Sequence, residues 1–265
     1  MLKQRIITAI TAALLLFAVL FLLPEYAARA VIALLFMIAA WEWSGFLGTG
    51  QNGRYLFTAL VAILILPSLV FEQPFAVTRT VFQIALVWWV LAFAWLFFYP
   101  TAIARPIRWF CGLLVIAPAY VAVDWLYQIS AWTLLFALAI VWAADIGAYF
   151  AGKSFGRVKL APQISPGKTW EGAIGGLFAV AILISVESYF LDFETATLLP
   201  LCLAVAVISV VGDLTVSVFK RTAGLKDSGS LFPGHGGFLD RADGVMAATP
   251  LFALGLGWLD GGFLL

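Results

Sequence analysis

Most residues that could carry chemistry lie in one segment, residues 213–243. The chain is 64% apolar and only 11% charged, so a dense group of charges needs a physical reason. Carboxylates are ligands of hard divalent cations such as Mg²⁺, and lysine and arginine bind phosphate oxygens. Both kinds of side chain alternate here, together with the only histidine of the chain: Asp213, Lys220, Arg221, Lys226, Asp227, His235, Asp240, Arg241 and Asp243. The segment therefore predicts a site where a divalent metal meets anionic phosphates.

The spacing within this segment indicates how the groups are positioned. Asp213, Ser217 and Lys220 follow one another at helical spacing, so on a continuing helix they share one face. Asp240 and Asp243 are likewise three residues apart. The intervening sequence GSLFPGHGGF contains too much glycine and proline for a helix interior. Free backbone N–H groups in such a loop suit oxyanions.

These residues resemble the signature of the phosphatidate cytidylyltransferase family, also called CDP-diglyceride synthases. The resemblance rests on Ser217, Lys220, Arg221, Lys226, Asp227, Pro233, His235, Gly236, Gly237, Asp240, Arg241 and Asp243. It implies a polytopic membrane enzyme that uses Mg²⁺ and transfers CMP from CTP to phosphatidate. The products would be pyrophosphate and CDP-diacylglycerol for phospholipid biosynthesis. Val216 departs from the family's glutamate, and Ala242 stands where a bulkier apolar residue is usual.

Asp145 lies in an apolar run that ends in a basic loop. It is one helical turn from Tyr149, and a carboxylate at membrane depth needs a compensating lysine or metal. Residues 147–154 match the formal P-loop expression. They follow an apolar helix rather than a buried strand, so we predict no P-loop here.

A polar group of residues, Ser165, Lys168 and Thr169, precedes the next apolar run. We expect a Ser-Pro turn that presents hydroxyls, a cation and helix N-terminal N–H groups to a phosphate. This group and the run around Asp145 also resemble the same family, although Ile146 replaces the Ser or Thr of its pattern. The resemblance thus covers about residues 143–243.

The hypothesis assigns three roles to these residues. The predicted catalytic residues are Asp213, Lys220, Lys226, Asp227 and Asp240. The predicted substrate-binding residues are Asp145, Ser165, Lys168, Thr169, Ser217, Arg221, His235 and Arg241. The predicted Mg²⁺ ligands are Asp213, Asp227, Asp240 and Asp243. A second metal or a monovalent cation stays open.

In the predicted mechanism, the metal neutralises charge at the α-phosphorus of CTP while the phosphatidate oxygen attacks in line and pyrophosphate leaves. A phosphate monoester is already a nucleophile, so no general base is required. Structural alternatives remain for single residues. Asp213 and Asp240 could form ion pairs with Lys220 and Arg241, and Asp243 could cap the helix that follows it. The single histidine either orders its loop or contacts phosphate.

Apolar runs decide the fold class. A mean hydropathy of +1.06 and 11 tryptophans are typical of membrane proteins. Nine apolar runs lie at about residues 6–23, 27–47, 55–71, 81–98, 109–123, 132–150, 173–190, 198–219 and 245–259. We predict an all-α polytopic integral membrane protein with about nine transmembrane helices. It would form a single membrane domain over residues 1–265, with residues 1–130 mainly scaffold and lipid contact and residues 131–265 carrying the site.

Lysine and arginine predict the orientation of the chain. If the N-terminus is cytoplasmic, only Arg29 and Arg79 of the 15 basic residues fall on the outer side. This is a strong positive-inside bias. We therefore expect a cytoplasmic N-terminus, a polar site at the cytoplasmic boundary of the C-terminal helices, and a bacterial inner membrane as the location.

Two features outside the signature carry further expectations. Glu42, between Trp41 and Trp43, either pairs with a basic loop or lies near the site, because acids at membrane depth are functional candidates. Gly172 and Gly176 form a G-x-x-x-G motif at the start of the seventh run, which predicts close helix packing.

Other classes of function stay open at this point. A secondary transporter also combines membrane acids, basic loops and glycine-interrupted helices. The acids gather at one face, however, and no inverted repeat is visible. A nearer alternative is a CTP-dependent enzyme that acts on another membrane lipid. The expected partners are CTP and phosphatidate in the bilayer, with a homodimer left open and no nucleic acid expected.

Overall fold

The computed structural model describes residues 2–71, 73–191, 195–231 and 236–259. The described chain is a helical bundle with one short hairpin. The helices are α1 (Leu2–Leu22), α2 (Glu25–Ser44), α3 (Gln51–Ile65), α4 (Phe75–Leu96), α5 (Arg105–Ile129), α6 (Ala131–Phe155), α7 (Trp170–Leu191), α8 (Thr195–Thr222) and α9 (Leu239–Leu259). Short 3-10 helices, η1 (Gly45–Leu47) and η2 (Leu66–Leu69), follow α2 and α3. Strands β1 (Lys159–Ala161) and β2 (Ser165–Thr169) connect α6 to α7.

Each predicted apolar run coincides with one of these helices, within a few residues at either end. Six helical segments are long and apolar enough to cross a membrane: Glu25–Leu47, Gln51–Leu69, Phe75–Leu96, Arg105–Ile129, Ala131–Phe155 and Leu198–Thr222. Ile10–Leu22 and Trp170–Val186 are shorter apolar helices. The prediction of a helical integral membrane protein is confirmed. By length and composition the described residues support six of the nine predicted spans.

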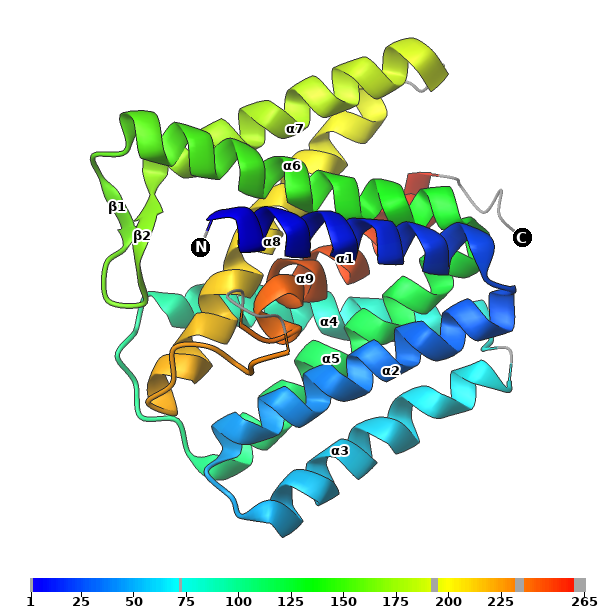
Figure 1. Cartoon of the computed structure of the whole chain (residues 1–265), viewed down its shortest axis with the longest axis vertical. Helices are drawn as coiled ribbons and strands as arrows, with labels where there is room; N and C mark the ends of the chain where they lie inside the picture. Colours follow the sequence, from blue (N-terminus) through cyan, green and yellow to red (C-terminus); the bar gives the residue numbers. More distant parts are fainter. Residues whose placement is uncertain (1, 72, 192–194, 232–235, 260–265) are drawn as a thin grey trace.

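Helix α9 lies at the centre of the bundle (Figure 1). It packs against α4, α5, α6 and α8, and nearly all its side chains between residues 242 and 255 are buried. A helix buried on every side belongs to the interior of a bundle. The charged first turns of α9, which carry Asp240, Arg241 and Asp243, are thereby held beside the end of α8.

Helix α8 ends directly after Lys220 and Arg221. Gly224 adopts a left-handed conformation with φ +72°, which glycine reaches without steric cost. The N–H of Leu225 donates to the carbonyl of Lys220 at 2.9 Å, and that of Gly224 donates to Arg221 at 3.0 Å. This pattern ends a helix and satisfies its last carbonyl groups. The two basic side chains are therefore fixed in the last turn.

Helices α6 and α7 run side by side with closely approaching backbones (Figure 1). A Cβ added to Gly176 would lie 2.6 Å from the backbone oxygen of Ala144, and one added to Gly172 would lie 2.9 Å from that of Ala148. Close packing at the G-x-x-x-G motif is thus confirmed. Residues 147–154 lie inside α6, so the prediction that they form no P-loop is also confirmed.

A buried ion pair joins α2 to α5 at the end of α2 that lies away from the start of α9. Arg29 Nε donates to Asp124 Oδ1 at 2.7 Å, and Arg29 Nη2 donates to Asp124 Oδ2 at 2.9 Å. The same Nη2 donates to the carbonyl of Ser68 at 2.6 Å. The Asp124 side chain is only 3% exposed, so its charge depends on this bidentate partner.

We expect Asp124→Asn to lower the free energy of unfolding by about 3 kcal/mol, because it removes the buried, bidentate counter-ion of Arg29 and leaves only the exposed Glu25 at 4.0 Å. Thermal unfolding of the purified variant in detergent would measure the loss. A melting temperature equal to that of the wild type would contradict this expectation. We expect no change in KM, since the pair lies at the far end of α2.

Candidate active site

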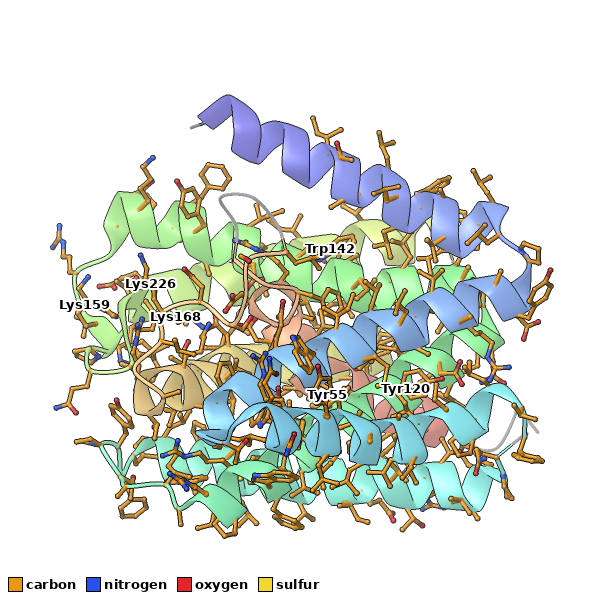
Figure 2. All side chains as sticks on the ribbon, turned by 60° about the horizontal axis from the view of Figure 1, so that its bottom comes forward. Tyr55, Tyr120, Trp142, Lys159, Lys168 and Lys226 are labelled. Carbon is orange, nitrogen blue, oxygen red and sulfur yellow. The ribbon has the colours of Figure 1, made fainter. Side chains whose placement is uncertain are left out.

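The predicted site residues gather where α8 ends, α9 begins and the β1–β2 hairpin projects from α6 and α7 (Figure 1). Lys159, Lys168 and Lys226 lie on the same side of the molecule, and Tyr120 of α5 lies well away from them (Figure 2). The hairpin therefore adds its positive charge to the end of the bundle that carries the charged ends of α8 and α9.

The Ser165–Thr169 segment is a strand, so the prediction of a Ser-Pro turn is wrong. It pairs antiparallel with β1, with Lys159 opposite Thr169 and Ala161 opposite Ser165. The turn lies instead at residues 162–164. Strand pairing satisfies backbone groups of both segments at once, which a local turn does not. The hairpin is also the exception to the predicted all-α fold. Ser165 lies half-buried at the start of β2.

Thr169 joins β2 to α7 and caps the helix. Its Oγ1 accepts a hydrogen bond from the N–H of Gly172 at 3.1 Å, and the side chain is buried. Threonine at this position satisfies one of the N–H groups that a helix start leaves free. The sequence assigned Thr169 to phosphate binding, and the structure gives its hydroxyl a capping contact.

Lys168 reaches from the hairpin to α8. Its Nζ lies 2.7 Å from Asp213 Oδ2, and Ser217 Oγ donates to Asp213 Oδ1 at 3.3 Å. Asp213 and Ser217 share one face of α8, as their spacing predicted. The Asp213 side chain is 33% exposed. A cation, a carboxylate and a hydroxyl thus meet at an accessible position on two segments far apart in sequence.

Lys220 and Asp240 form a second ion pair, and this one is buried. Lys220 Nζ donates to Asp240 Oδ1 at 2.7 Å, with the two side chains 9% and 8% exposed. Asp240 Oδ2 accepts from Ser228 N at 2.7 Å, from Ser228 Oγ at 2.9 Å and from Gly237 N at 2.9 Å. Burial opposes the ionisation of Asp240, but the Lys220 ammonium and the two N–H groups outweigh it and lower the pKa of this carboxyl. The alternative that Asp240 forms an ion pair is therefore observed, with Lys220 as the partner.

Two further carboxylates, Asp145 and Asp243, approach Asp213. Asp145 is an exposed residue of α6, whereas Asp243 is buried in α9 and accepts the N–H of the next residue at 2.8 Å. Both interact electrostatically with Asp213 and with Lys168. Helix α9 begins before Asp243, so the alternative that this residue caps the helix is wrong. Asp145, Asp213 and Asp243, which come from three different helices, therefore all interact with the positively charged Lys168 of the hairpin.

The donor set for a metal is smaller than the sequence predicted. Within the described ranges, no three Asp, Glu, His or Cys side chains lie close enough together to hold a metal ion. Mg²⁺ often takes one or two carboxylates and completes its shell with water and phosphate. Asp213 and Asp243 fit this smaller set, because their carboxylates interact electrostatically and α8 and α9 touch beside both residues, at Gly212. Asp240 fits less well, since its oxygens already accept four hydrogen bonds.

The other predicted residues line the same region. Arg221 donates from Nε to the carbonyl of Ile164 at 3.4 Å, which joins α8 to the hairpin turn. Lys226 and Asp227 are exposed in the segment between α8 and α9, and Arg241 is exposed in the first turn of α9. Arg241 interacts electrostatically with the Asp145 carboxylate. The predicted His235 lies outside the described residues.

Glu42 lies next to the site, and the sequence alone allowed two interpretations of its role. It is buried at the end of α2, and its carboxylate accepts hydrogen bonds from Ser228 Oγ and from the N–H groups of Phe238 and Leu239. It therefore lies near the site, and its partners among the described residues are a hydroxyl and backbone N–H groups rather than basic side chains. An acid within an apolar run was the signal for Glu42. No signal singled out Ser228.

Comparison with known proteins gives a consistent result. Residues 3–258 match the model of the Cytidylyltransferase family. A protein of Pseudomonas aeruginosa named phosphatidate cytidylyltransferase is 42% identical over 263 residues, which covers 96% of each chain. A protein of Haemophilus influenzae with the same name is 35% identical, covering 96% of this chain and 98% of the relative. A protein of Brucella suis, also with that name, is 49% identical over 123 residues, or 46% of each chain.

Proposed function

Because the chain belongs to the cytidylyltransferase family, we propose that it transfers CMP from CTP to phosphatidate, forming CDP-diacylglycerol and pyrophosphate. The observation that carries this proposal is the meeting of the Lys168–Asp213 and Lys220–Asp240 pairs at one end of a membrane bundle. Such a position lets a water-soluble triphosphate reach a lipid phosphate at the bilayer surface. The transporter alternative loses its support, because the relatives are named as transferases.

The accessible cations are suited to phosphate binding. Lys168 and Asp213 form a partly exposed pair, and Lys226, Arg221 and Arg241 are exposed around it. An arriving phosphate competes with Asp213 for Lys168, because both offer oxygen acceptors to the ammonium group. Phosphoryl-type transfer depends on positioning and charge stabilisation more than on covalent chemistry from the protein. The chain's own contribution is therefore to hold the two phosphates in line and to neutralise their repulsion.

Asp213 and Asp243 are the residues that would hold Mg²⁺, and Asp145 is a further carboxylate that interacts electrostatically with Asp213. Their side chains offer hard oxygen ligands. The lysines and the arginine around them are positively charged and can balance the negative phosphates of a bound substrate. When bound, Mg²⁺ would supply charge neutralisation at the phosphates of CTP.

We propose further that nine helices cross a bacterial inner membrane and that the site faces the cytoplasm. The basic hairpin supports this orientation, since Lys153, Arg157, Lys159 and Lys168 all belong to α6, β1, β2 or the short connections between them. CTP is a cytoplasmic nucleotide, so a site on this side meets its substrate directly. A homodimer stays an expectation that crosslinking in native membranes would test.

The activity is tested with purified protein in detergent, CTP labelled at the α-phosphate, phosphatidate and Mg²⁺. We expect label in the organic phase and release of an equal amount of pyrophosphate. Diacylglycerol and a polyprenol, offered with CTP labelled at the γ-phosphate, test the alternative that another lipid is the acceptor, because phosphorylation of a lipid alcohol transfers that phosphate. Absence of labelled lipid with every phosphatidate and metal tried would refute the proposal, and uptake into vesicles without CTP turnover would revive the transporter.

A further inference from the structure

Glu42 makes a contact that the proposed reaction does not yet use. Its side chain is 6% exposed and lies at the end of α2, in the half of the chain that the sequence assigned to scaffold. Oε1 accepts from Phe238 N at 3.0 Å, and Oε2 accepts from Leu239 N at 2.8 Å. These N–H groups belong to the start of α9, where a helix has no internal acceptors and favours a negative charge.

A chain of hydrogen bonds continues from Glu42 into the site. The hydroxyl of Ser228 lies 2.9 Å from Glu42 Oε2 and 2.9 Å from Asp240 Oδ2, so it lies between the two carboxylates and shares its single proton between them. Asp240 in turn binds Lys220 of α8. The Glu42 carboxylate therefore connects α2, the segment 223–238, α9 and α8 through a single buried network.

Glycine lines this carboxylate on two sides. A Cβ added to Gly229 would lie 2.5 Å from Glu42 Oε1, and one added to Gly237 would clash with both carboxylate oxygens. Glycine at these positions lets the backbone approach the acid closely. The segment is thus held against Glu42 at both of its described parts, Ser228–Gly229 and Gly237–Leu239.

We propose that Glu42 is a positioning residue for CMP transfer. Its carboxylate fixes the segment between α8 and α9, and the exposed Lys226, Asp227 and Arg241 flank the fixed points. Glu42 touches no substrate itself and acts through the segment that it holds. This inference rests on the proposed transferase activity.

Loss of the Glu42 contacts predicts a particular change in KM and kcat. Without Glu42 the segment samples many conformations, and the apparent affinity for substrate falls by the fraction of molecules in the competent one. Substrate binding then has to order the segment again. Saturating CTP restores that ordering, so KM rises while kcat is largely retained. A residue that only stabilised the fold would instead lower the number of active molecules and leave KM unchanged.

The test compares Glu42→Gln with Asp124→Asn, a matched change of a buried carboxylate of α5 that pairs with Arg29 at the far end of α2. We expect Glu42→Gln to raise KM for CTP by about 10- to 100-fold, by analogy with the loss caused by mutating residues that orient metal ligands. Amide hydrogen exchange in residues 228–231 and 236–239 should become faster. Glu42→Asp should recover part of the affinity. Asp124→Asn should lower the melting temperature with KM unchanged.

Two further comparisons ensure that the test can distinguish its outcomes. Ser228→Ala removes only the bridging hydroxyl and should raise KM by a smaller factor, so it carries the test should Glu42→Gln fail to fold. An active wild type beside variants with unchanged KM would overturn this inference alone. A wild type that transfers no CMP would overturn the proposed function, and this inference with it.

Discussion

Replacing Asp213 with asparagine is expected to lower kcat/KM for CMP transfer by about 10²- to 10³-fold, the loss typical of one preorganised electrostatic group in an active site. The melting temperature should change little. Asp213 is 33% exposed and its ion pair with Lys168 is partly open, so the pair contributes little to folding. In the proposed reaction its charge places Lys168 and would provide a ligand for Mg²⁺. Initial rates with labelled CTP and thermal unfolding in detergent measure both quantities.

The matched control for Asp213→Asn is Glu25→Gln. Glu25 is an exposed carboxylate at the start of α2, 4.0 Å from Arg29, and it lies far from the candidate active site. Both activity and melting temperature should stay at the wild-type level in this control. Near-normal activity in Asp213→Asn would remove Asp213 from the reaction. A fall in activity that merely follows a fall in stability would assign it a structural role.

The sequence predicted those parts of the fold that depend on local pattern. Apolar runs placed the helices, because burial in lipid requires a long apolar segment whatever its neighbours are. The face shared by Asp213 and Ser217 followed from helical spacing, and Gly172 and Gly176 indicated close packing of α6 on α7. In each case the cause lies within a few residues of the feature.

Contacts between residues that are far apart in the sequence could not be predicted from such local patterns. The β1–β2 hairpin was missed because strands of three and five residues are too short for a period of two to be recognised. Glu42 meets Ser228 across 186 residues, and the sequence shows only that a buried acid needs some partner. Likewise, the pairing of Asp240 with Lys220 depends on how α8 packs on α9.

We expect Asp240→Asn to lower the free energy of unfolding by about 3–5 kcal/mol, because it leaves the Lys220 ammonium buried without a counter-ion, and to lower kcat/KM for transfer as well. This combination separates Asp240 from Asp213. The Asp240 carboxylate accepts four hydrogen bonds from three residues, so its loss releases α8 and the segment before α9 together. Thermal unfolding and initial rates on the same preparation would measure both effects.

The double variant Lys220→Met with Asp240→Asn distinguishes a structural ion pair from a direct role in the reaction. Removing the lysine also removes the unpaired buried charge, so part of the lost stability should return. Activity should not return with it, because Ser228 and Gly237 still lack the ionised acceptor that holds their segment in place. If Asp240→Asn were instead as stable as the wild type yet inactive, the carboxylate would act directly on metal or substrate, as its sequence motif predicted.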